Sequence, residues 1–281
     1  MPSEQRVAAP ASSFVCPQCK GALAGLFCPA CNHQYATEGG FPLLLPRDPA
    51  LAISRELVAV YEEIYTEHAG VWVNQGRTAA FIEYFSRKLN AYQPRALLEI
   101  GCGEGVLLRE LQANRKWATD LAISALTKAA AATAVEACVA LGEQLPFADG
   151  FFDVVTSVGV MEHFVDDARA SREICRVTRV GGHYVVLIHI HLSVWQSIQQ
   201  KISEYIFPVP RPLGLLRWLT GKFYKPVHQP IQNAYTIASV QACLEQAGFR
   251  VTAIIHRGVN ADVPLIGPHV IIYVCEKPEQ R

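Results

Sequence analysis

The stretch Leu97-Leu98-Glu99-Ile100-Gly101-Cys102-Gly103-Glu104-Gly105 decides the fold of this chain. Its first four residues predict a buried β-strand, and the glycines predict a tight turn at which a ligand can approach the backbone closely. Turns that bind dinucleotides have their third glycine one position later, where this chain has Val106. The carboxylate of Glu99 suits a cationic ligand and would repel a pyrophosphate. The turn therefore favours a positively charged nucleoside over NAD.

From residue 95 onward, short apolar segments alternate with segments of helical length. This alternation predicts an α/β fold with a doubly wound, mostly parallel, seven-stranded sheet covered by helices on both faces. We predict strands near residues 96–100, 116–119, 136–140, 151–158, 183–190, 249–256 and 269–276, and helices near 105–113, 122–134, 167–179 and 236–247.

Four of the nine cysteines form two CxxC pairs, Cys16 with Cys19 and Cys28 with Cys31. Each pair places two thiolates on one tight turn, and two such pairs complete a tetrahedral sulfur site for a structural Zn²⁺. About thirty residues cannot bury an adequate apolar core, so the metal would supply the folding free energy. The alternative, disulfides or a chance pairing, fits this spacing less well.

The domain organisation that we expect has four parts. Residues 1–13 form a disordered N-terminus, residues 14–46 the zinc ribbon, residues 47–92 a helical linker or cap, and residues 93–281 the α/β domain, with a lid insertion at 192–232. The N-terminus lacks the apolar run of a signal peptide, and the longest apolar stretches are only as long as strands. We therefore expect a cytoplasmic protein without a transmembrane helix.

The charge balance bears on the partners of the protein. Lys+Arg and Asp+Glu number 25 each, so the formal net charge is zero, which disfavours binding to nucleic acid. The insertion at 192–232 combines basic and aromatic residues. It is either a packed cap over the active site or a lid for an anionic, amphiphilic substrate, which could also rest peripherally on a membrane. The sequence leaves the oligomeric state open.

Further signals follow the glycine turn in order. Asp120 ends the second predicted strand, where a carboxylate can accept both ribose hydroxyls of a nucleoside. After it come Leu145-Pro146-Phe147, Phe152-Asp153-Val154-Val155, Glu162-His163 and the Gly181-Gly182 turn. With the glycine turn, this ordered set resembles the class I S-adenosylmethionine-dependent methyltransferases, in particular the methyltransferase type 11 group, over about residues 95–190.

The resemblance implies S-adenosylmethionine as the methyl donor and gives each matching residue a role. Glu99 and the glycines Gly101, Gly103 and Gly105 would form the loop at the methionine end, and Asp120 would bind the ribose. Leu121 would flank the adenine, Glu143 and Gln144 would lie at its edge, and Val160 would end the fourth strand. The chain departs from the family at Leu141, where an acid is common, and at Val180, where proline is usual.

Methyl transfer depends mostly on alignment of the nucleophile and exclusion of water, and an oxygen or acidic-carbon nucleophile also benefits from a base. His163 follows the fourth strand and His189 ends the fifth, so both are candidate catalytic residues, although either could be an ordinary structural histidine. Tyr61 and Tyr65 could close over the cofactor. We expect methyl transfer to a small molecule or biosynthetic intermediate, at oxygen. The alternatives are an RNA methyltransferase and a non-catalytic, cofactor-binding partner protein.

Overall fold

The computed structural model describes residues 13–51, 53–67, 79–190, 231, 233–258 and 269–279. Of the predicted lid at 192–232, only Ile231 is described. The first twelve residues also lie outside the described ranges. Within the described ranges, no helix is long and apolar enough to cross a membrane.

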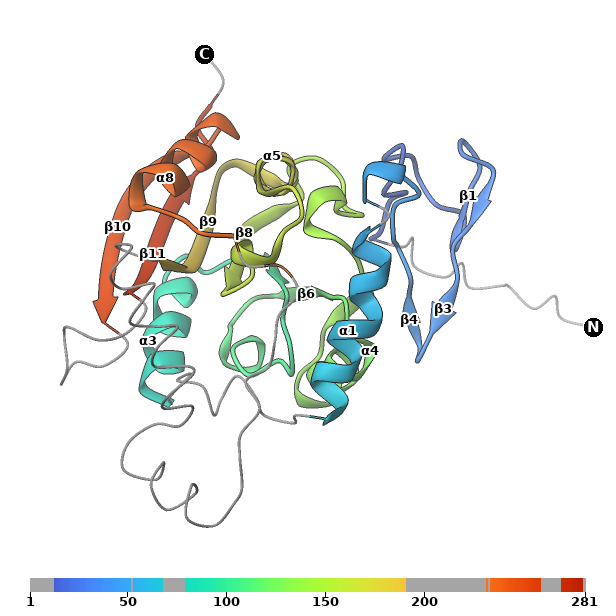
Figure 1. The fold of residues 1–281 in the computed structure, drawn as a ribbon, viewed down its shortest axis with the longest axis horizontal. Helices are drawn as coiled ribbons and strands as arrows, with labels where there is room; N and C mark the ends of the chain where they lie inside the picture. The colour runs from blue at the N-terminus through green and yellow to red at the C-terminus, as the bar shows by residue number, and fades with distance from the viewer. Residues whose placement is uncertain are drawn as a thin grey trace, which may run out of the picture.

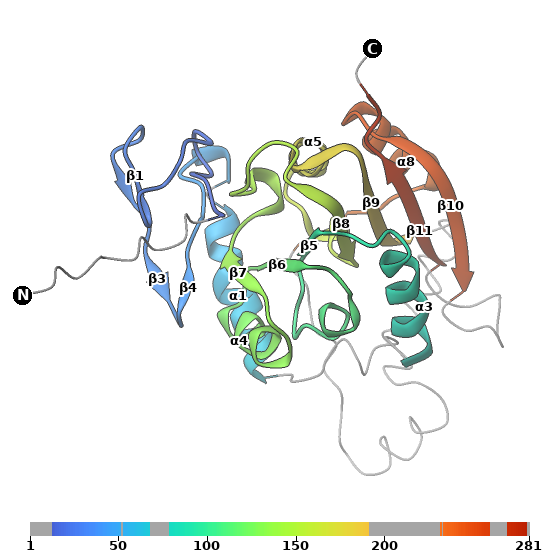
Figure 2. The same cartoon turned by 180° about the vertical axis from the view of Figure 1, so that it is seen from behind.

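A seven-stranded sheet forms the centre of the protein, in the order β10-β11-β9-β8-β5-β6-β7 (Figures 1 and 2). The strands from β9 to β7 run parallel to one another, and β11 is antiparallel to both of its neighbours. This arrangement confirms the predicted fold class. The strand bounds are β5 (Ala96–Ile100), β6 (Arg115–Asp120), β7 (Glu136–Val139), β8 (Phe152–Val158), β9 (Thr178–Ile190), β10 (Arg250–Gly258) and β11 (His269–Glu276).

Helices cover both faces of the sheet. Consecutive side chains of a strand point to opposite faces, so neighbouring residues pack against different helices. In β5, Leu97 packs into the cluster that contains α3 (Ala79–Asn90) and α4 (Ile123–Ala132). Its neighbour Leu98 packs into the cluster that contains α5 (Asp167–Val177) and α8 (Ile237–Gln246). Figures 1 and 2 show α5 and α8 together near the C-terminus, away from α3 and α4. Strand β5 is therefore buried on both faces, and its one charged residue, Glu99, is buried with it.

The helix that we predicted at residues 105–113 is wrong. Only one short 3-10 turn, η2 (Leu108–Glu110), forms there, and Leu111 is already extended. Gly105 has a φ of +73°, which no right-handed helix can accommodate. The fifth parallel strand also differs, because β9 begins at Thr178 rather than near residue 183 and so contains Gly181 and Gly182.

Gly105 also fixes how closely α4 packs against the glycine turn. A Cβ atom at this position would lie 2.8 Å from Cα of Ala129. We expect Gly105→Ala to lower the free energy of unfolding by about 3 kcal/mol, from left-handed strain and from overpacking. Gly150→Ala is the control, since its φ is +63° but its Cβ would meet nothing closer than 3.6 Å. Urea denaturation should give a loss of about 1 kcal/mol there; equal losses would contradict the packing argument.

Two small hairpins form the N-terminal region. The first pairs β1 (Phe27–Cys28) with β2 (His33–Gln34), and the second pairs β3 (Thr37–Glu38) with β4 (Phe41–Pro42). After β4 the chain runs beside β7, where Leu43 bridges to Val139 in parallel and the Leu44 N–H donates to the Val139 carbonyl at 2.9 Å. Figure 2 shows this region beside the β7 edge of the sheet.

Between the hairpins and the sheet, the described residues are mostly helical. They form η1 (Pro49–Leu51), α1 (Ile53–Glu67) and, closer to β5, α3. The carboxylate of Glu62 accepts the backbone N–H of Ser124 in the first turn of α4, at 3.1 and 3.2 Å. This bond attaches α1 to the α/β domain next to the ends of the central strands.

Candidate active site

A pocket opens where the central parallel strands end. Ile100 and Asp120 are the last residues of β5 and β6, Ala140 follows β7, and Gly159 follows β8. In open α/β sheets, ligands bind in the crevice at the carboxyl ends of the strands. The lining residues are Leu57, Tyr61, Tyr65, Ile100, Gly101, Thr119, Asp120, Leu121, Ala140, Leu141, Gly142, Glu143, Gly159, Val160, His163, Phe164 and Val165.

The glycine turn is held by the acid at the end of β6. One carboxylate oxygen of Asp120 accepts the Gly103 N–H at 2.8 Å, and the other accepts the Ala122 N–H at 3.0 Å. Gly101 has a φ of +64°, and a Cβ there would lie 2.5 Å from Cγ2 of Val160. The turn is therefore preformed, and the carboxylate that holds it lines the pocket, where such an acid can accept a ribose hydroxyl.

Helix α1 supplies one wall of the pocket through Leu57, Tyr61 and Tyr65. Tyr65 lies against the glycine turn, so that a Cβ at Gly103 would be 2.7 Å from its hydroxyl oxygen. Burial, followed by the negative charges of Asp120, Glu162 and Glu143, raises the pKa of Tyr61. Tyr61 therefore stays a neutral hydroxyl that can donate a hydrogen bond towards this acidic pocket.

The wall after β7 is η3 (Gly142–Gln144). The Glu143 carboxylate accepts the N–H groups of Val165, at 2.7 Å, and Asp166, at 3.4 Å. Burial raises the pKa of Glu143, although these bonds oppose the shift. The Gln144 side chain accepts a bond from Arg169 at 3.1 Å and does not line the described pocket.

The two candidate catalytic histidines have different surroundings, although both lie near η4 (Met161–His163). His163 lines the pocket, and its Nδ1 lies 2.6 Å from the Ile231 carbonyl oxygen. His189 does not line the described pocket; its Nδ1 lies 2.9 Å from the buried carboxylate of Glu162, and 46% of its side chain is exposed. Burial raises the pKa of Glu162, but the His189 hydrogen bond and charge outweigh it, so the net pKa is lowered.

The structure brings only some of the predicted cofactor residues to the pocket surface. Those that line it are Gly101, Asp120, Leu121, Glu143 and Val160. Those outside the described lining are Glu99, Gly103, Gly105 and Gln144. Glu99 lies within β5 and is only 1% exposed.

Sequence reasoning missed several lining residues, including Thr119, Gly142 and Phe164. Gly142 is next to Glu143 in the sequence, which was a signal for its place at the site. The structure gives the reason for glycine there, because a Cβ atom would overlap the Phe164 ring.

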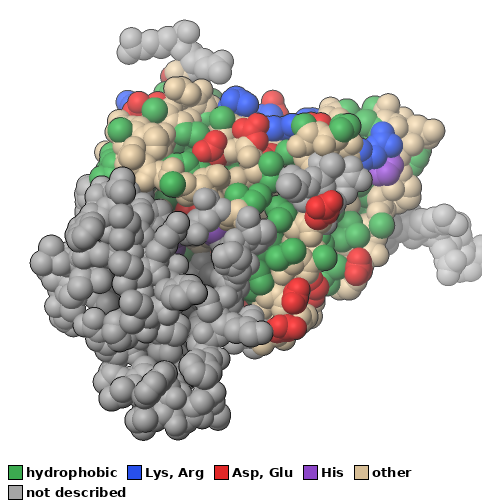
Figure 3. Space-filling model, in the orientation of Figure 1, with side chains coloured by type: hydrophobic (Ala, Val, Ile, Leu, Met, Phe, Trp, Pro, Cys, Tyr) green, Lys and Arg blue, Asp and Glu red, His purple; other side chains and the backbone are tan. Residues whose placement is uncertain are grey.

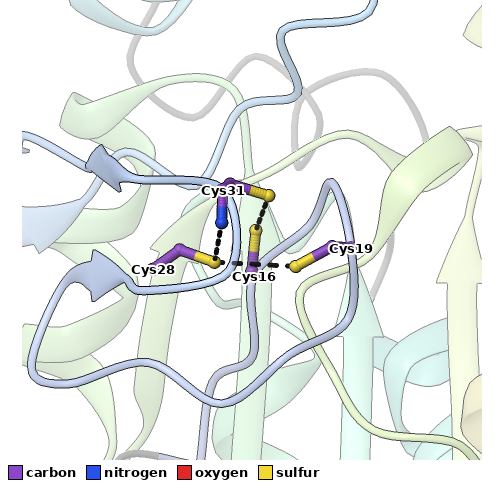
Figure 4. Close-up of side chains that lie close together, drawn as sticks. All are labelled: Cys16, Cys19, Cys28 and Cys31. Carbon is purple, nitrogen blue, oxygen red and sulfur yellow. Dashed lines mark hydrogen bonds between the residues drawn. The ribbon is translucent and has the colours of Figure 1, made fainter.

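The four paired cysteines converge on one point. Their sulfur atoms all lie within 4.8 Å of one another, and the side chains face inward (Figure 4). Sγ of Cys16 lies 3.8 Å from that of Cys31, and Sγ of Cys19 lies 3.5 Å from that of Cys28. A tetrahedral ion with Zn–S bonds of about 2.3 Å separates its sulfur ligands by about 3.8 Å, so this cluster fits Zn²⁺.

Backbone N–H groups and a tyrosine surround the sulfur atoms. The Gly21 N–H donates to Sγ of Cys19 and the Cys31 N–H to Sγ of Cys28, both at 3.4 Å. The Tyr35 hydroxyl lies 3.1 Å from Sγ of Cys16. Such donors orient thiolate ligands and offset their negative charge.

Comparison with known proteins identifies the domain. Residues 98–186 match the family model described as a methyltransferase domain. The chain is 38% identical over 92 residues to a demethylmenaquinone methyltransferase of Mycolicibacterium vanbaalenii, covering 32% of this chain and 40% of that protein. It is 30% identical over 132 residues to the ajmaline N-methyltransferase of Rauvolfia serpentina, covering 43% and 45%.

A solved complex of a Haloferax volcanii methyltransferase activator with a methyltransferase has a chain of similar fold. The TM-score is 0.58 at 14% identity, and the match covers 81% of this chain and 98% of that one. Residues 98–186 thus resemble a methyltransferase domain, and the described chain shares its fold with a solved chain of a methyltransferase complex. This chain spans only about two fifths of the length of the curated relatives above.

Proposed function

We propose that this protein transfers a methyl group from S-adenosylmethionine to a small-molecule acceptor. The observation that carries the proposal is the pocket at the strand ends. There the Asp120 carboxylate and the Gly101 turn share the lining with the apolar side chains of Leu121, Leu141 and Val160. A carboxylate suits a ribose diol, and the apolar walls suit an adenine ring. The bound donor would supply a methyl group activated by its positive sulfonium.

Calorimetry with S-adenosylhomocysteine, the demethylated product, tests this proposal. We expect one site per chain with micromolar affinity. NAD should not bind, because the turn has Val106 where dinucleotide-binding turns have their third glycine. A protein that binds NAD, or that binds neither ligand, would contradict the proposal.

We also propose that Cys16, Cys19, Cys28 and Cys31 hold a structural zinc ion. The four inward-facing sulfurs support this proposal, since they fill every position of a tetrahedral ion and leave none open for a reacting water. The metal would therefore stabilise the ribbon and take no part in methyl transfer.

The acceptor belongs to the small-molecule class in this proposal. Its support is that both curated relatives are named for small-molecule acceptors, a quinone precursor and an alkaloid. Acidic and basic side chains are also mixed on the described face shown in Figure 3, where the described residues form no continuous basic surface of the kind that RNA binding needs. Methylation at oxygen remains our prediction, and these names do not support it, since one specifies nitrogen and that of a further relative specifies carbon.

We assign the role of general base to His163 rather than to His189. A carbonyl oxygen only accepts, so the bond to Ile231 requires a proton on Nδ1 and leaves the lone pair on Nε2. Burial lowers the pKa of His163, and the Ile231 bond offsets this shift only in part. The lowered pKa keeps the ring neutral at neutral pH. Nε2 can then accept the proton of an acceptor hydroxyl as its oxygen attacks the methyl carbon and the sulfur leaves with the bonding electron pair.

His163→Gln should lower kcat by about 100-fold or more, while the affinity for S-adenosylhomocysteine changes little. Because the pKa of His163 lies below its ordinary value of 6.5, the wild-type rate should be constant above that pH and fall below it as the base becomes protonated. The measurement is transfer of labelled methyl to a hydroxylated quinone across pH 5 to 9.

His183→Gln is the matched control. This ring stacks on Tyr92 at 4.1 Å and does not line the described pocket, so kcat should be retained. An unchanged kcat in His163→Gln, or an acidic limb centred well above pH 6.5, would remove His163 from the mechanism.

A further inference from the structure

The N-terminal region forms hydrogen bonds to the chain segment that forms one wall of the cofactor pocket. This segment runs from β7 through η3 to Pro146, and Figure 2 shows the ribbon beside β7. The Leu44 N–H donates to the Val139 carbonyl, and the Val15 N–H donates to the Pro146 carbonyl, both at 2.9 Å. The wall is therefore held at both ends by residues that flank the cysteine cluster in sequence.

Between these ends, Lys20 makes the most specific contact. Its Nζ donates to the Leu145 carbonyl at 3.1 Å and to the Glu173 carboxylate at 2.7 Å. The same oxygen of Glu173 accepts the Leu145 N–H at 3.0 Å. Both polar backbone groups of Leu145 are thus bound within one ion pair, whose side chains are only 26% and 15% exposed.

The position of Lys20 depends in turn on the first CxxC turn. Lys20 follows Cys19 directly, has a φ of +60°, and donates its own N–H to the Cys16 carbonyl at 2.8 Å. A non-glycine residue keeps such a conformation only where the surrounding structure enforces it. Closure of the cysteine cluster around a metal would supply that constraint.

A second contact reaches the pocket wall from just beyond the ribbon. The Asp48 carboxylate lies 2.7 Å from Nη1 of Arg169, whose Nε donates to the Glu143 carbonyl at 3.2 Å. Glu143 lines the pocket, and Leu145 follows it by two residues. Displacement of the ribbon would therefore release η3 on the side away from the cofactor.

We propose that the ribbon positions the cofactor-binding wall, with Lys20 as the positioning residue, so that metal binding at the four cysteines raises the affinity for S-adenosylmethionine. This inference rests on the proposed function, since it concerns the same pocket. A segment that must be ordered on binding weakens affinity, and prior ordering by the ribbon removes that cost.

The first test uses the wild-type full-length protein and needs no variant. S-adenosylhomocysteine is titrated calorimetrically before and after removal of the metal by a chelator, with zinc content measured on each sample. We expect the dissociation constant to rise about fivefold or more on removal and to recover when zinc is restored. Amide exchange at residues 141–147 should accelerate in the same samples. An unchanged dissociation constant would overturn the inference.

The second test separates Lys20 from the metal. In Lys20→Met, the zinc content should stay at the wild-type level and the dissociation constant should rise about fivefold, rather than binding being abolished, because Arg176 still donates to the Leu145 carbonyl at 3.1 Å. Lys20→Arg should recover most of the affinity. Arg47→Met is the matched control, because it removes an exposed cation of the same region.

The outcomes of both tests are distinct from failure of the proposed function. A protein that never binds S-adenosylhomocysteine contradicts the methyltransferase proposal. A protein that binds it equally well with and without metal, or with and without the Lys20 ammonium, contradicts only the inference about the ribbon and leaves the methyltransferase proposal intact. If Lys20→Met loses its zinc, the metal-removal experiment on the wild-type chain decides.

Discussion

Asp120→Ala is expected to weaken the affinity for S-adenosylhomocysteine by about 100-fold. Each hydrogen bond between a ribose hydroxyl and a carboxylate contributes about 1.5–3 kcal/mol, and the substitution removes two of them, which together correspond to at least two decades in affinity. Asp120 also accepts the N–H groups of Gly103 and Ala122, so the glycine turn loses its anchor as well. Calorimetry on the purified variant measures the loss.

A control must separate loss of the ligand contact from loss of a buried carboxylate. Asp153 serves this purpose: it is 8% exposed, against 7% for Asp120, and accepts two backbone N–H groups, from Arg95 and Ala96, at 2.9 and 2.8 Å. It lies at the opposite end of the parallel strands. Both alanine variants should lose about 2–4 kcal/mol of folding stability. If Asp153→Ala weakens binding as much as Asp120→Ala, Asp120 has no specific role at the ribose.

The sheet was predictable because its signals are local. Apolar runs such as residues 185–188 are buried on both faces wherever helices flank a parallel sheet, and the spacing between runs leaves room for one crossover each. The failure at residues 105–113 is also local in origin. Our prediction placed the third glycine both in the tight turn and at the first position of the helix, and its positive φ excludes the second role.

The site was less predictable because its walls come from distant parts of the chain. Asp120 ends β6, and Val160, which we predicted to end the fourth strand, follows the last residue of β8 by two positions. The ends of parallel strands meet at one edge, so the place of both residues at the pocket followed from the topology. Glu99 was placed at the pocket from its distance in sequence to the glycines, but its backbone position within β5 buries it. The contact between Lys20 and Leu145 spans 125 residues and leaves no periodic signal.

Cys16→Ser is expected to abolish stoichiometric zinc binding and to unfold the ribbon. Cys16 is fully buried in the cluster, and serine is a far weaker zinc ligand than a thiolate. Structural zinc contributes on the order of 10 kcal/mol to domains of this size, which exceeds any stability that the short hairpins supply by themselves. Atomic emission should find about one zinc per wild-type chain and almost none in the variant, and limited proteolysis should then cleave within residues 14–46.

Cys138→Ser is the matched control for this prediction. Cys138 is also fully buried, but it lies in β7 outside the cluster, so its substitution should cost about 1–2 kcal/mol and leave the zinc in place. Cleavage of the ribbon in both variants would mean that general destabilisation, rather than metal loss, exposes it. Retention of zinc by Cys16→Ser would rule out four-sulfur coordination. The stability of the ribbon would then have to come from its contacts with β7 and η3, and the dependence of cofactor affinity on metal would lose its physical basis.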